Sequence, residues 1–224
     1  MYKTVEQCKR DIIEVGKILY DKGLLVGTDG NISIRISEEE VLITASGFCK
    51  GKLSQDQITK VDMEGNILSG MKPARDIRMH LAVYKERPGV KAVVHAHPPV
   101  TTGHAMSEVS FDKIALPEVL FVLKGIAVTR YTTPTTIEVP VEIRRVLSEN
   151  PECQTILLSN HGALTLSTDV YDAFYKMETL EMFLTANLVT RILGNTRYLN
   201  QEQMTKVNRL IKGESPDEVV RPGD

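Results

Sequence analysis

The spacing of apolar side chains along the chain predicts a mixture of helices and strands. From Cys8 to Leu19, apolar residues recur every three or four positions, which is the period of an amphipathic helix. The Thr-Val-Glu-Gln sequence that begins at Thr4 has the spacing of a capping box, and Gly23 is the expected stop. From Ile32 to Ile36, isoleucine alternates with polar residues, which predicts a strand. The segment before it, residues 27–31, is therefore expected to be a loop.

Similar patterns continue to the C-terminal region. Strands are expected over residues 41–44, 58–63 paired with 67–68 as a hairpin, 90–97, 155–158 and 163–166. Helices are expected over residues 72–87, 137–147, 169–193 and 201–211, with Pro140 tolerated only in a first turn. Residues 98–133 give no clear pattern. Because regular βαβ alternation is missing, the pattern favours a layered α/β or α+β domain over a doubly wound nucleotide-binding fold.

Composition narrows the class of protein. The chain has 224 residues, 42% hydrophobic and 25% charged, which is typical of one globular domain, here residues 1–224 with a polar tail from about 213. A net charge of -2 disfavours nucleic-acid binding. No apolar run approaches the ~20 residues that cross a bilayer, so a soluble, cytoplasmic protein without membrane partners is expected. The cysteines at 8, 49 and 153 argue against a disulfide scaffold.

Three of the five histidines occupy positions suited to a metal ion. Alternation in the strand at 90–97 puts His95 and His97 on one face, about 7 Å apart. They can be polar residues on a solvated sheet face, or they can share one ion. His161, in a turn after an apolar strand, is either a hydrogen-bonded turn residue or a third ligand. Three imidazoles with an open position are the composition of a catalytic zinc site. His80 and His104 are expected to pack or to lie at the surface.

Two further groups of residues are candidates for proton transfer and anion binding. Asp76 is expected in the first turn of the helix after Pro73, where its carboxylate would complement the helix dipole. The same carboxylate is a candidate acid or base. Gly27 to Asn31, and the Ser46-Gly47 pair, are suited to bind an oxyanion through exposed N–H groups and a hydroxyl.

Five segments in a fixed order resemble the class II aldolase/adducin family, and within it the fuculose-1-phosphate aldolase branch. They are Gly27-Thr28-Asp29-Gly30-Asn31-Ile32-Ser33, Thr44-Ala45-Ser46-Gly47, Lys72-Pro73-Ala74-Arg75-Asp76, His95-Ala96-His97 and Asn160-His161-Gly162. The resemblance runs from the first helix to about Leu193. It implies an α/β fold with three α/β/α layers around a mainly antiparallel sheet. It also implies a homotetramer with active sites between subunits.

The resemblance implies a role for each candidate residue. His95, His97 and His161 would bind a divalent metal, zinc first and otherwise Mn²⁺ or another ion. Asp76 stands where the family has a glutamate that serves as both metal ligand and acid/base, and would inherit both roles. The positions that would hold the substrate phosphate are Gly30, Asn31, Ser46 and Gly47.

The chain also departs from the family pattern. The two serines that complete the phosphate pocket are replaced by Ala74 and Arg75. The guanidinium of Arg75 would instead bind a phosphate or a carboxylate. In addition, Phe121 takes the place of a tyrosine proton donor, and Glu118 is a candidate substitute for that donor.

These residues lead to one functional hypothesis and three alternatives. The hypothesis is a lyase of carbohydrate metabolism that reversibly cleaves a ketose 1-phosphate to dihydroxyacetone phosphate and a short aldehyde, through a metal-stabilised enediolate. The same fold could serve a decarboxylase of a 3-oxo sugar-acid phosphate. It could also serve a sugar-phosphate 4-epimerase, a branch that also has aspartate where Asp76 lies. The alternative of another class is an adducin-like binding module without catalysis. The sequence leaves the aldehyde, the physiological metal and the need for phosphate open.

Overall fold

Among the residues that the computed structural model describes, 3–107, 111 and 113–214, eight strands form one sheet in the order β4-β3-β2-β1-β5-β8-β7-β6. The strands are β1 (Asn31–Arg35), β2 (Glu40–Thr44), β3 (Ile58–Asp62), β4 (Ile67–Ser69), β5 (Ala92–Ala96), β6 (Ala127–Val128), β7 (Thr155–Leu158) and β8 (Gly162–Ser167). All neighbouring strands are antiparallel except β6 and β7, which are parallel. The expectation of a mainly antiparallel sheet is therefore confirmed.

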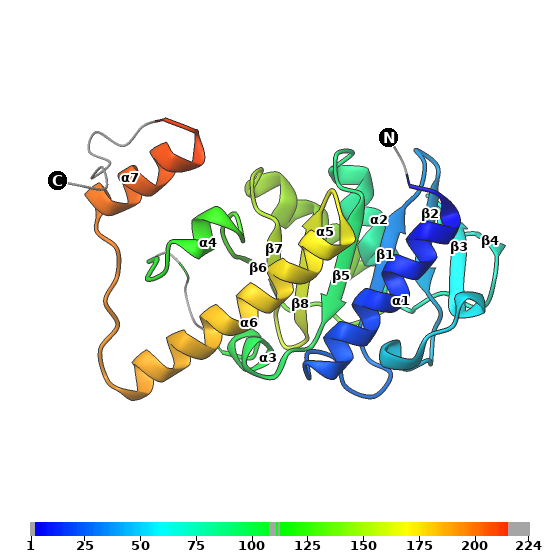
Figure 1. Ribbon diagram of the computed structural model, residues 1–224, viewed down its shortest axis with the longest axis horizontal. Coiled ribbons are helices and arrows are strands. Elements are labelled where there is room, and N and C mark those ends of the chain that lie inside the picture. Colours follow the sequence, from blue (N-terminus) through cyan, green and yellow to red (C-terminus); the bar gives the residue numbers. More distant parts are fainter. Residues whose placement is uncertain (1–2, 108–110, 112, 215–224) are drawn as a thin grey trace, which may run out of the picture.

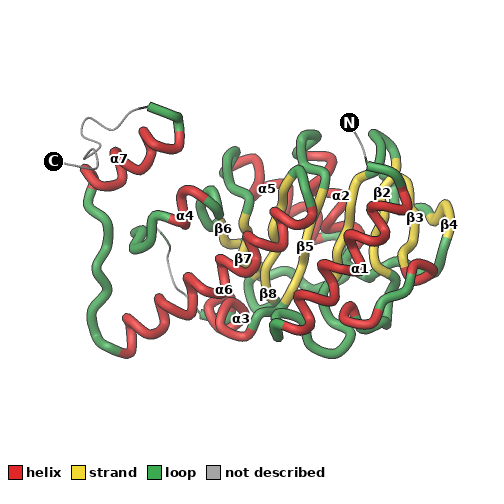
Figure 2. Tube along the Cα trace, viewed as in Figure 1, coloured by secondary structure: helices red, strands yellow, loops and turns green. Residues whose placement is uncertain are grey.

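Helices cover both faces of this sheet (Figures 1 and 2). They are α1 (Val5–Asp21), α2 (Ile77–Glu86), α3 (Pro99–Ala105), α4 (Glu118–Phe121), α5 (Glu138–Glu149), α6 (Val170–Ile192) and α7 (Gln201–Ile211). The short 3-10 helices η1 (Lys50–Lys52) and η2 (Gln55–Gln57) follow β2. Two separate apolar cores show the layering, since α1 and α6 pack into one and α2 and α5 into the other. The three-layer α/β/α architecture is confirmed.

Most helix boundaries follow from local chemistry. The hydroxyl of Thr4 accepts a hydrogen bond from the Gln7 amide and caps α1, and Asp169 caps α6 in the same way. Pro140 is the third residue of α5, in the first turn, where its missing N–H leaves no intrahelical bond broken. The predicted last helix, over residues 201–211, is confirmed as α7.

The predicted helix over residues 72–87 starts too early. The observed α2 begins at Ile77, because the segment before it continues the sheet. Pro73 forms a β-bridge with Ala45, and the amide of Ala74 donates to the carbonyl of Thr44 at 3.0 Å. Asp76 is consequently the N-cap residue and not a residue of the first turn, and its side chain makes no capping hydrogen bond.

The stretch without a clear pattern, residues 98–133, contains α3, α4 and β6. A long-range contact stabilises α3: the carboxylate of Glu181, in α6, accepts hydrogen bonds from the amides of Val100 and Thr101 at 3.0 and 2.7 Å. In the described part of the chain, no helix combines the length and apolar character needed to cross a membrane. Most of the predicted polar tail lies outside the described residues, and the single-domain assignment stays a prediction.

Candidate metal centre and active site

The central strand β5 carries the first histidine of the candidate site. His95 lies opposite Asn31 of β1 on one side and Leu164 of β8 on the other, so its side chain is fully buried. His97 comes one residue after the strand ends at Ala96. His161 lies in the turn between β7 and β8. Neighbouring strands therefore bring residues from distant parts of the chain to the same end of the sheet.

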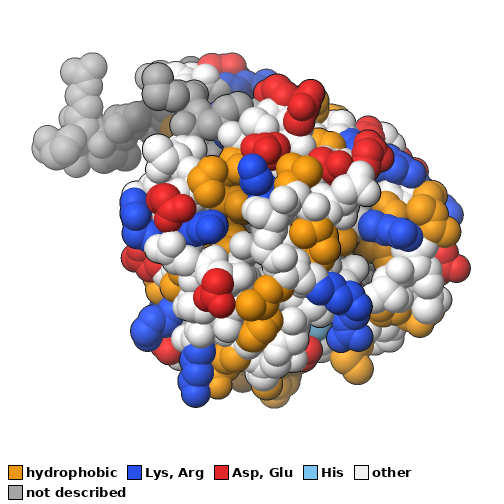
Figure 3. Space-filling model, turned by 90° about the vertical axis from the view of Figure 1, so that its right-hand side faces the viewer, with side chains coloured by type: hydrophobic (Ala, Val, Ile, Leu, Met, Phe, Trp, Pro, Cys, Tyr) orange, Lys and Arg blue, Asp and Glu red, His pale blue; other side chains and the backbone are white. Residues whose placement is uncertain are grey.

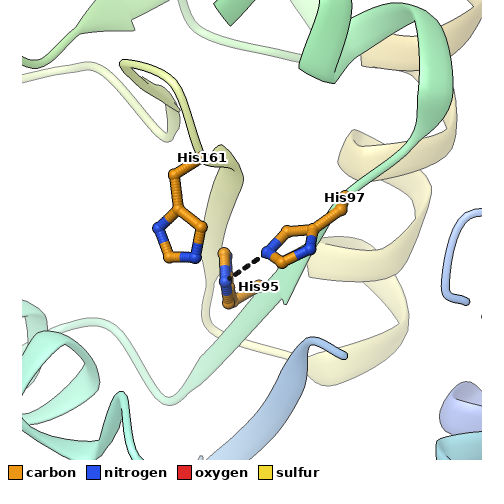
Figure 4. Close-up of side chains that lie close together, drawn as sticks. All are labelled: His95, His97 and His161. Carbon is orange, nitrogen blue, oxygen red and sulfur yellow. Dashed lines mark hydrogen bonds between the residues drawn. The ribbon is translucent and has the colours of Figure 1, made fainter. Parts of the chain in front are cut away.

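These three imidazoles form one cluster. Their potential ligand atoms all lie within 4.8 Å of one another, and the ring centroids are 4.7 to 4.9 Å apart. In Figure 4 the rings of His95, His97 and His161 point toward a common centre. Nε2 of His95 and Nε2 of His97 are 3.0 Å apart. No other group of three or more potential ligands was found among the described residues, so His80 and His104 lie outside the cluster.

The protonation of His95 suits metal binding. Its Nδ1 lies 2.9 Å from the carbonyl oxygen of Ala163, which can only accept a hydrogen bond, so Nδ1 carries the proton. Nε2 of the neutral ring then presents a lone pair to the cluster, as in metal sites where the second ring nitrogen is fixed by a carbonyl. Burial lowers the pKa of all three histidines, and their mutual proximity lowers that of His95 and His97 further. The cluster therefore favours neutral imidazoles, which are the form that binds metal.

The turn that carries His161 has special backbone geometry. Asn160 has a φ of 57°, the left-handed conformation that asparagine tolerates better than most residues. At Gly162, a Cβ atom would lie 2.5 Å from Cδ2 of His97 and 2.6 Å from the carbonyl oxygen of Ala96. Glycine is thus required here so that the turn can pack against the His97 ring.

Asp76 is held beside the cluster by a contact from β1. Nδ2 of Asn31 donates to Oδ2 of Asp76 at 2.8 Å. Burial lowers the pKa of His97 and of His161, whereas the negative charge of Asp76 acts to raise both. This carboxylate therefore lies within electrostatic range of both rings. The segment that was expected to start a helix thus places the Asp76 carboxylate near the histidines, and this carboxylate does not cap α2.

Behind Asn31 lies a buried chain of hydrogen bonds. Oδ1 of Asn31 accepts from Nε2 of His80, which leaves Nδ1 of His80 to accept from the Ser33 hydroxyl at 2.7 Å. The Ser33 oxygen lies 2.7 Å from the hydroxyl of Tyr84, and all four side chains are buried. Burial lowers the pKa of His80 to about 4, although the charge of Asp76 acts in the opposite direction. His80 is therefore a neutral core residue that orients the Asn31 amide, and not a ligand.

A cavity of about 230 Å³ opens beside the cluster. It contains the predicted anion-binding residues Gly30, Asn31, Ser46, Gly47 and Arg75, together with Asp76, His97 and His161. Its other lining residues are Thr28, Asp29, Lys50, Ala74, Pro134 and Thr135. On the face shown in Figure 3, histidine is visible only as a small pale-blue area near basic side chains. The structure thus brings metal-ligand chemistry and anion-binding chemistry into one cavity.

Gly30 is required for this arrangement. Its φ is 69°, and a Cβ atom there would lie 2.3 Å from Cδ2 of Leu25 and 2.6 Å from the carbonyl oxygen of His95. Only glycine allows the loop to approach β5 this closely.

Comparisons with known proteins decide the family. A family model described as "Class II Aldolase and Adducin N-terminal domain" matches residues 10–188. This chain belongs to the class II aldolase and adducin family. An L-fuculose phosphate aldolase of Methanococcus maripaludis is 31% identical over 184 residues, which are 82% of this chain and 97% of that protein. A 3-oxo-tetronate 4-phosphate decarboxylase of Haemophilus influenzae is 32% identical over 202 residues, which are 88% and 93% of the two chains.

The structural comparison agrees with the family assignment. A solved L-fuculose 1-phosphate aldolase superposes with a TM-score of 0.84 at 25% identity, over 94% of this chain and 98% of that chain. The resemblance of the five sequence segments to the class II aldolase and adducin family is confirmed. Class II aldolases use a divalent metal, and the three-histidine cluster is compatible with one.

Glu118, the candidate substitute for the missing tyrosine donor, lies outside the cavity, whereas Lys50, which the sequence did not indicate as a site residue, lies in it. Phe121 and Glu118 belong to α4 and do not line the cavity. Lys50 does line it, although its side chain is 2% exposed. The sequence contains a weak signal for Lys50, since it follows the Ser46-Gly47 pair by only three residues. A lysine in a polar loop is usually solvated, and only the fold shows that this one is buried.

Proposed function

We propose that this chain is a metal-dependent aldolase that reversibly cleaves a ketose 1-phosphate to dihydroxyacetone phosphate and a short aldehyde. The observation that carries this proposal is the cluster of three imidazoles beside a cavity that Asp76, His97 and His161 line together with residues that suit a phosphate. The similarity to L-fuculose phosphate aldolases supports the same substrate class.

His95, His97 and His161, with Asp76, would hold the divalent metal. We infer zinc, because neutral imidazole nitrogens with one carboxylate oxygen are a preferred zinc donor set, and Mn²⁺ is the alternative. When bound, such an ion supplies Lewis-acid electron withdrawal at the substrate carbonyl. A Schiff-base lysine is not required for this chemistry.

The remaining residues of the cavity bind and orient the substrate in this proposal. Backbone N–H groups at Gly30 and Gly47 and the hydroxyl of Ser46 would hold the phosphate. Arg75 takes the place of the serine contacts that this chain lacks, and its guanidinium can bind two phosphate oxygens at once. The Asn31 amide can bind substrate through only part of its side chain, because its oxygen accepts from His80 and one of its N–H groups donates to Asp76. Its second N–H is the donor left for substrate.

Asp76 is the proposed acid/base. Its carboxylate makes no capping hydrogen bond to α2, so the helix does not engage the oxygens that would exchange a proton with substrate. Asn31 holds one of these oxygens in place through the 2.8 Å contact. Since Phe121 has no hydroxyl and Glu118 lies away from the cavity, Asp76 is the carboxylate that we propose for proton transfer within this chain.

We also propose that the enzyme works as a cytoplasmic homotetramer with active sites between subunits. Exposed apolar side chains at the end of α6 support association, since Ile192 and Leu193 are 76% and 77% exposed. Size-exclusion chromatography with light scattering measures the oligomeric state directly. A monomer at micromolar concentration would contradict this part of the proposal.

A product assay tests the reaction. The protein, purified without chelator, is incubated with fuculose 1-phosphate and other ketose 1-phosphates, and dihydroxyacetone phosphate is measured with a coupled NADH-dependent reductase. Release of this product, abolished by a chelator and restored by Zn²⁺, is expected. If no ketose 1-phosphate yields it, the aldolase proposal is wrong.

A second candidate function is decarboxylation of a 3-oxo sugar-acid phosphate, and Arg75 is the observation that favours it. An acid substrate offers a second anion for the guanidinium, and a decarboxylase is among the similar proteins. Only this reaction releases carbon dioxide, so a carbon dioxide assay with such a substrate separates the two. A 4-epimerase would give neither product and would change only the sugar configuration, which NMR detects.

The non-catalytic alternative is an adducin-like binding module. The complete cluster of His95, His97 and His161 argues against it, because a scaffold has no chemical need for three neutral imidazoles around one point. Metal analysis of the purified protein tests this alternative. A protein that retains no divalent ion would favour the module.

A further inference from the structure

Lys50 is a buried cation that is not among the metal and substrate residues described above. Its side chain is 2% exposed, at the start of η1. Nζ donates hydrogen bonds to the carbonyl oxygens of Thr28 at 2.6 Å and Phe48 at 2.9 Å. An ammonium group has three N–H donors, and within the described residues the third has no recorded acceptor.

The charge of Lys50 is not matched by an ion pair. Among the described residues, no carboxylate oxygen lies within 4.0 Å of its Nζ, whereas the other deeply buried lysine, Lys176, is paired with Asp172. Asp29 and Asp76 raise the pKa of Lys50 from a longer range, but burial lowers it by more. Burying a cation without a partner is costly, so a counter-ion would stabilise this position.

The surroundings of Lys50 place this cation at the cavity. Lys50 lines it, and so do Thr28, whose carbonyl binds its Nζ, and the Ser46-Gly47 pair that precedes it in sequence. The backbone of Lys50 is also held firmly. A Cβ atom on Gly16 of α1 would lie 2.6 Å from the Lys50 carbonyl oxygen, so α1 packs directly against this residue. The backbone that carries the Lys50 side chain is therefore packed closely against α1.

We propose that Lys50 is an anion-binding residue of this cavity, whose third N–H and positive charge bind the phosphate group of the substrate beside Ser46 and Gly47. The inference rests on the proposed function for the location of the phosphate. In this proposal, Lys50 adds a buried positive charge to a pocket that lacks the two serine hydroxyls. A purely structural role would be to tie the loop at Thr28 to the loop at Phe48. That role is satisfied by two hydrogen bonds and does not require a positive charge.

The test measures binding of inorganic phosphate by isothermal titration calorimetry, so it does not depend on turnover. The full chain is titrated with its metal bound, and again after chelation, which removes phosphate binding to the metal itself. Lys50→Met is expected to weaken phosphate binding at least about tenfold in both states, because a charge-assisted hydrogen bond is lost. Lys50→Gln removes the charge but keeps a donor for one carbonyl, and serves if the Met variant does not fold.

Lys176→Met is the matched control, since it also removes a deeply buried lysine but lies on α6 outside the cavity. It is expected to lower stability and to leave phosphate affinity unchanged. Three results would overturn the proposal: wild-type affinity in both Lys50 variants, loss of phosphate binding on chelation, or no phosphate binding by the wild type. If Lys50-dependent binding is found but no ketose 1-phosphate is cleaved, the aldolase proposal fails and this inference stands.

Discussion

Nδ2 of Asn31 donates a 2.8 Å hydrogen bond to Oδ2 of Asp76, and this contact connects the first strand of the sheet to the residue that precedes α2. Asn31 is itself oriented by the buried His80. Because Asp76 makes no capping bond to its own helix, the position of its carboxylate depends on β1. The proposed acid/base is thus held by a residue 45 positions away in sequence.

Replacement of Asp76 by asparagine is expected to reduce kcat at least about 100-fold, because the group that exchanges a proton with substrate is lost. Asp76 is also a proposed metal ligand, so metal affinity should fall as well, and kcat is therefore compared at saturating Zn²⁺, where the three histidines still hold the ion. Steady-state kinetics and metal analysis of Asp76→Asn measure both quantities. Asp21→Asn, on the exposed end of α1, is the control and should behave as wild type. Wild-type turnover by Asp76→Asn would refute its catalytic role.

Replacement of His161 by alanine is expected to remove most of the bound divalent metal. Loss of a hydrogen-bond partner of a ligand already costs about 10–100-fold in metal affinity, and loss of a ligand should cost more. Metal content after gel filtration is the measurement. His104→Ala is the control, because His104 is a buried histidine that lies outside the cluster. If His161→Ala keeps its full metal content, His161 is not a ligand.

The stability of the protein should depend on pH through His80. Burial lowers the pKa of His80 from its usual 6.5 to about 4, so the folded protein favours the neutral ring. As pH falls, the unfolded chain binds the proton first. The contribution of His80 to stability is therefore fully present above pH 6.5 and is lost progressively as pH falls toward 4.

Comparison with His80→Gln isolates this effect from the titration of the other histidines. The free energy of unfolding, measured by urea denaturation at two pH values, should fall by about 2 kcal/mol more in the wild type than in His80→Gln between about pH 7 and pH 5. Parallel losses in the two proteins would show that His80 is not the titrating group.

Alanine substitutions at Gly30 and Gly23 separate two contributions to the loss of stability, the strain of the backbone conformation and the steric overlap of an added Cβ. Both have a positive φ, 69° and 70°, but a Cβ on Gly23 would meet no atom within 4 Å. Gly23→Ala should destabilise the protein by about 1 kcal/mol, from the left-handed conformation alone. Gly30→Ala should cost about 3 kcal/mol in total, because its Cβ would also overlap Leu25 and the carbonyl of His95. Equal losses in urea denaturation would contradict this assignment.

Arg75 should contribute to substrate binding. Arg75→Ala is expected to raise KM for a ketose 1-phosphate about 10–100-fold, and Arg75→Lys should restore only part of the affinity, because a lysine cannot bind two oxygens in a fork. Arg144→Ala, an exposed arginine on α5 outside the cavity, is the control. An effect confined to acid substrates would favour the decarboxylase. An unchanged KM for both substrate classes would show that Arg75 does not bind substrate.

The amino-acid sequence by itself determined the elements whose signals are local, such as α1, β1 and α7. A side-chain cap, a period of 3.6 or 2 residues and a breaking residue are all encoded within a few positions. It also determined the family, because five short segments occur in one order. Tertiary structure decided what depends on distant partners: the start of α2 at Ile77, where Pro73 joins the sheet beside Ala45, and α3, whose first amides are bound by Glu181.

The candidate site divides in the same way. The sequence selected the types and spacing of His95, His97 and Asp76, since these residues carry recognisable chemistry. Only the fold decided that Asn31 lies between Asp76 and His80, and that Lys50 is buried beside the same cavity. Hydrogen-bond partners and burial depend on which strands become neighbours, and local propensity contains no information about residues tens of positions apart.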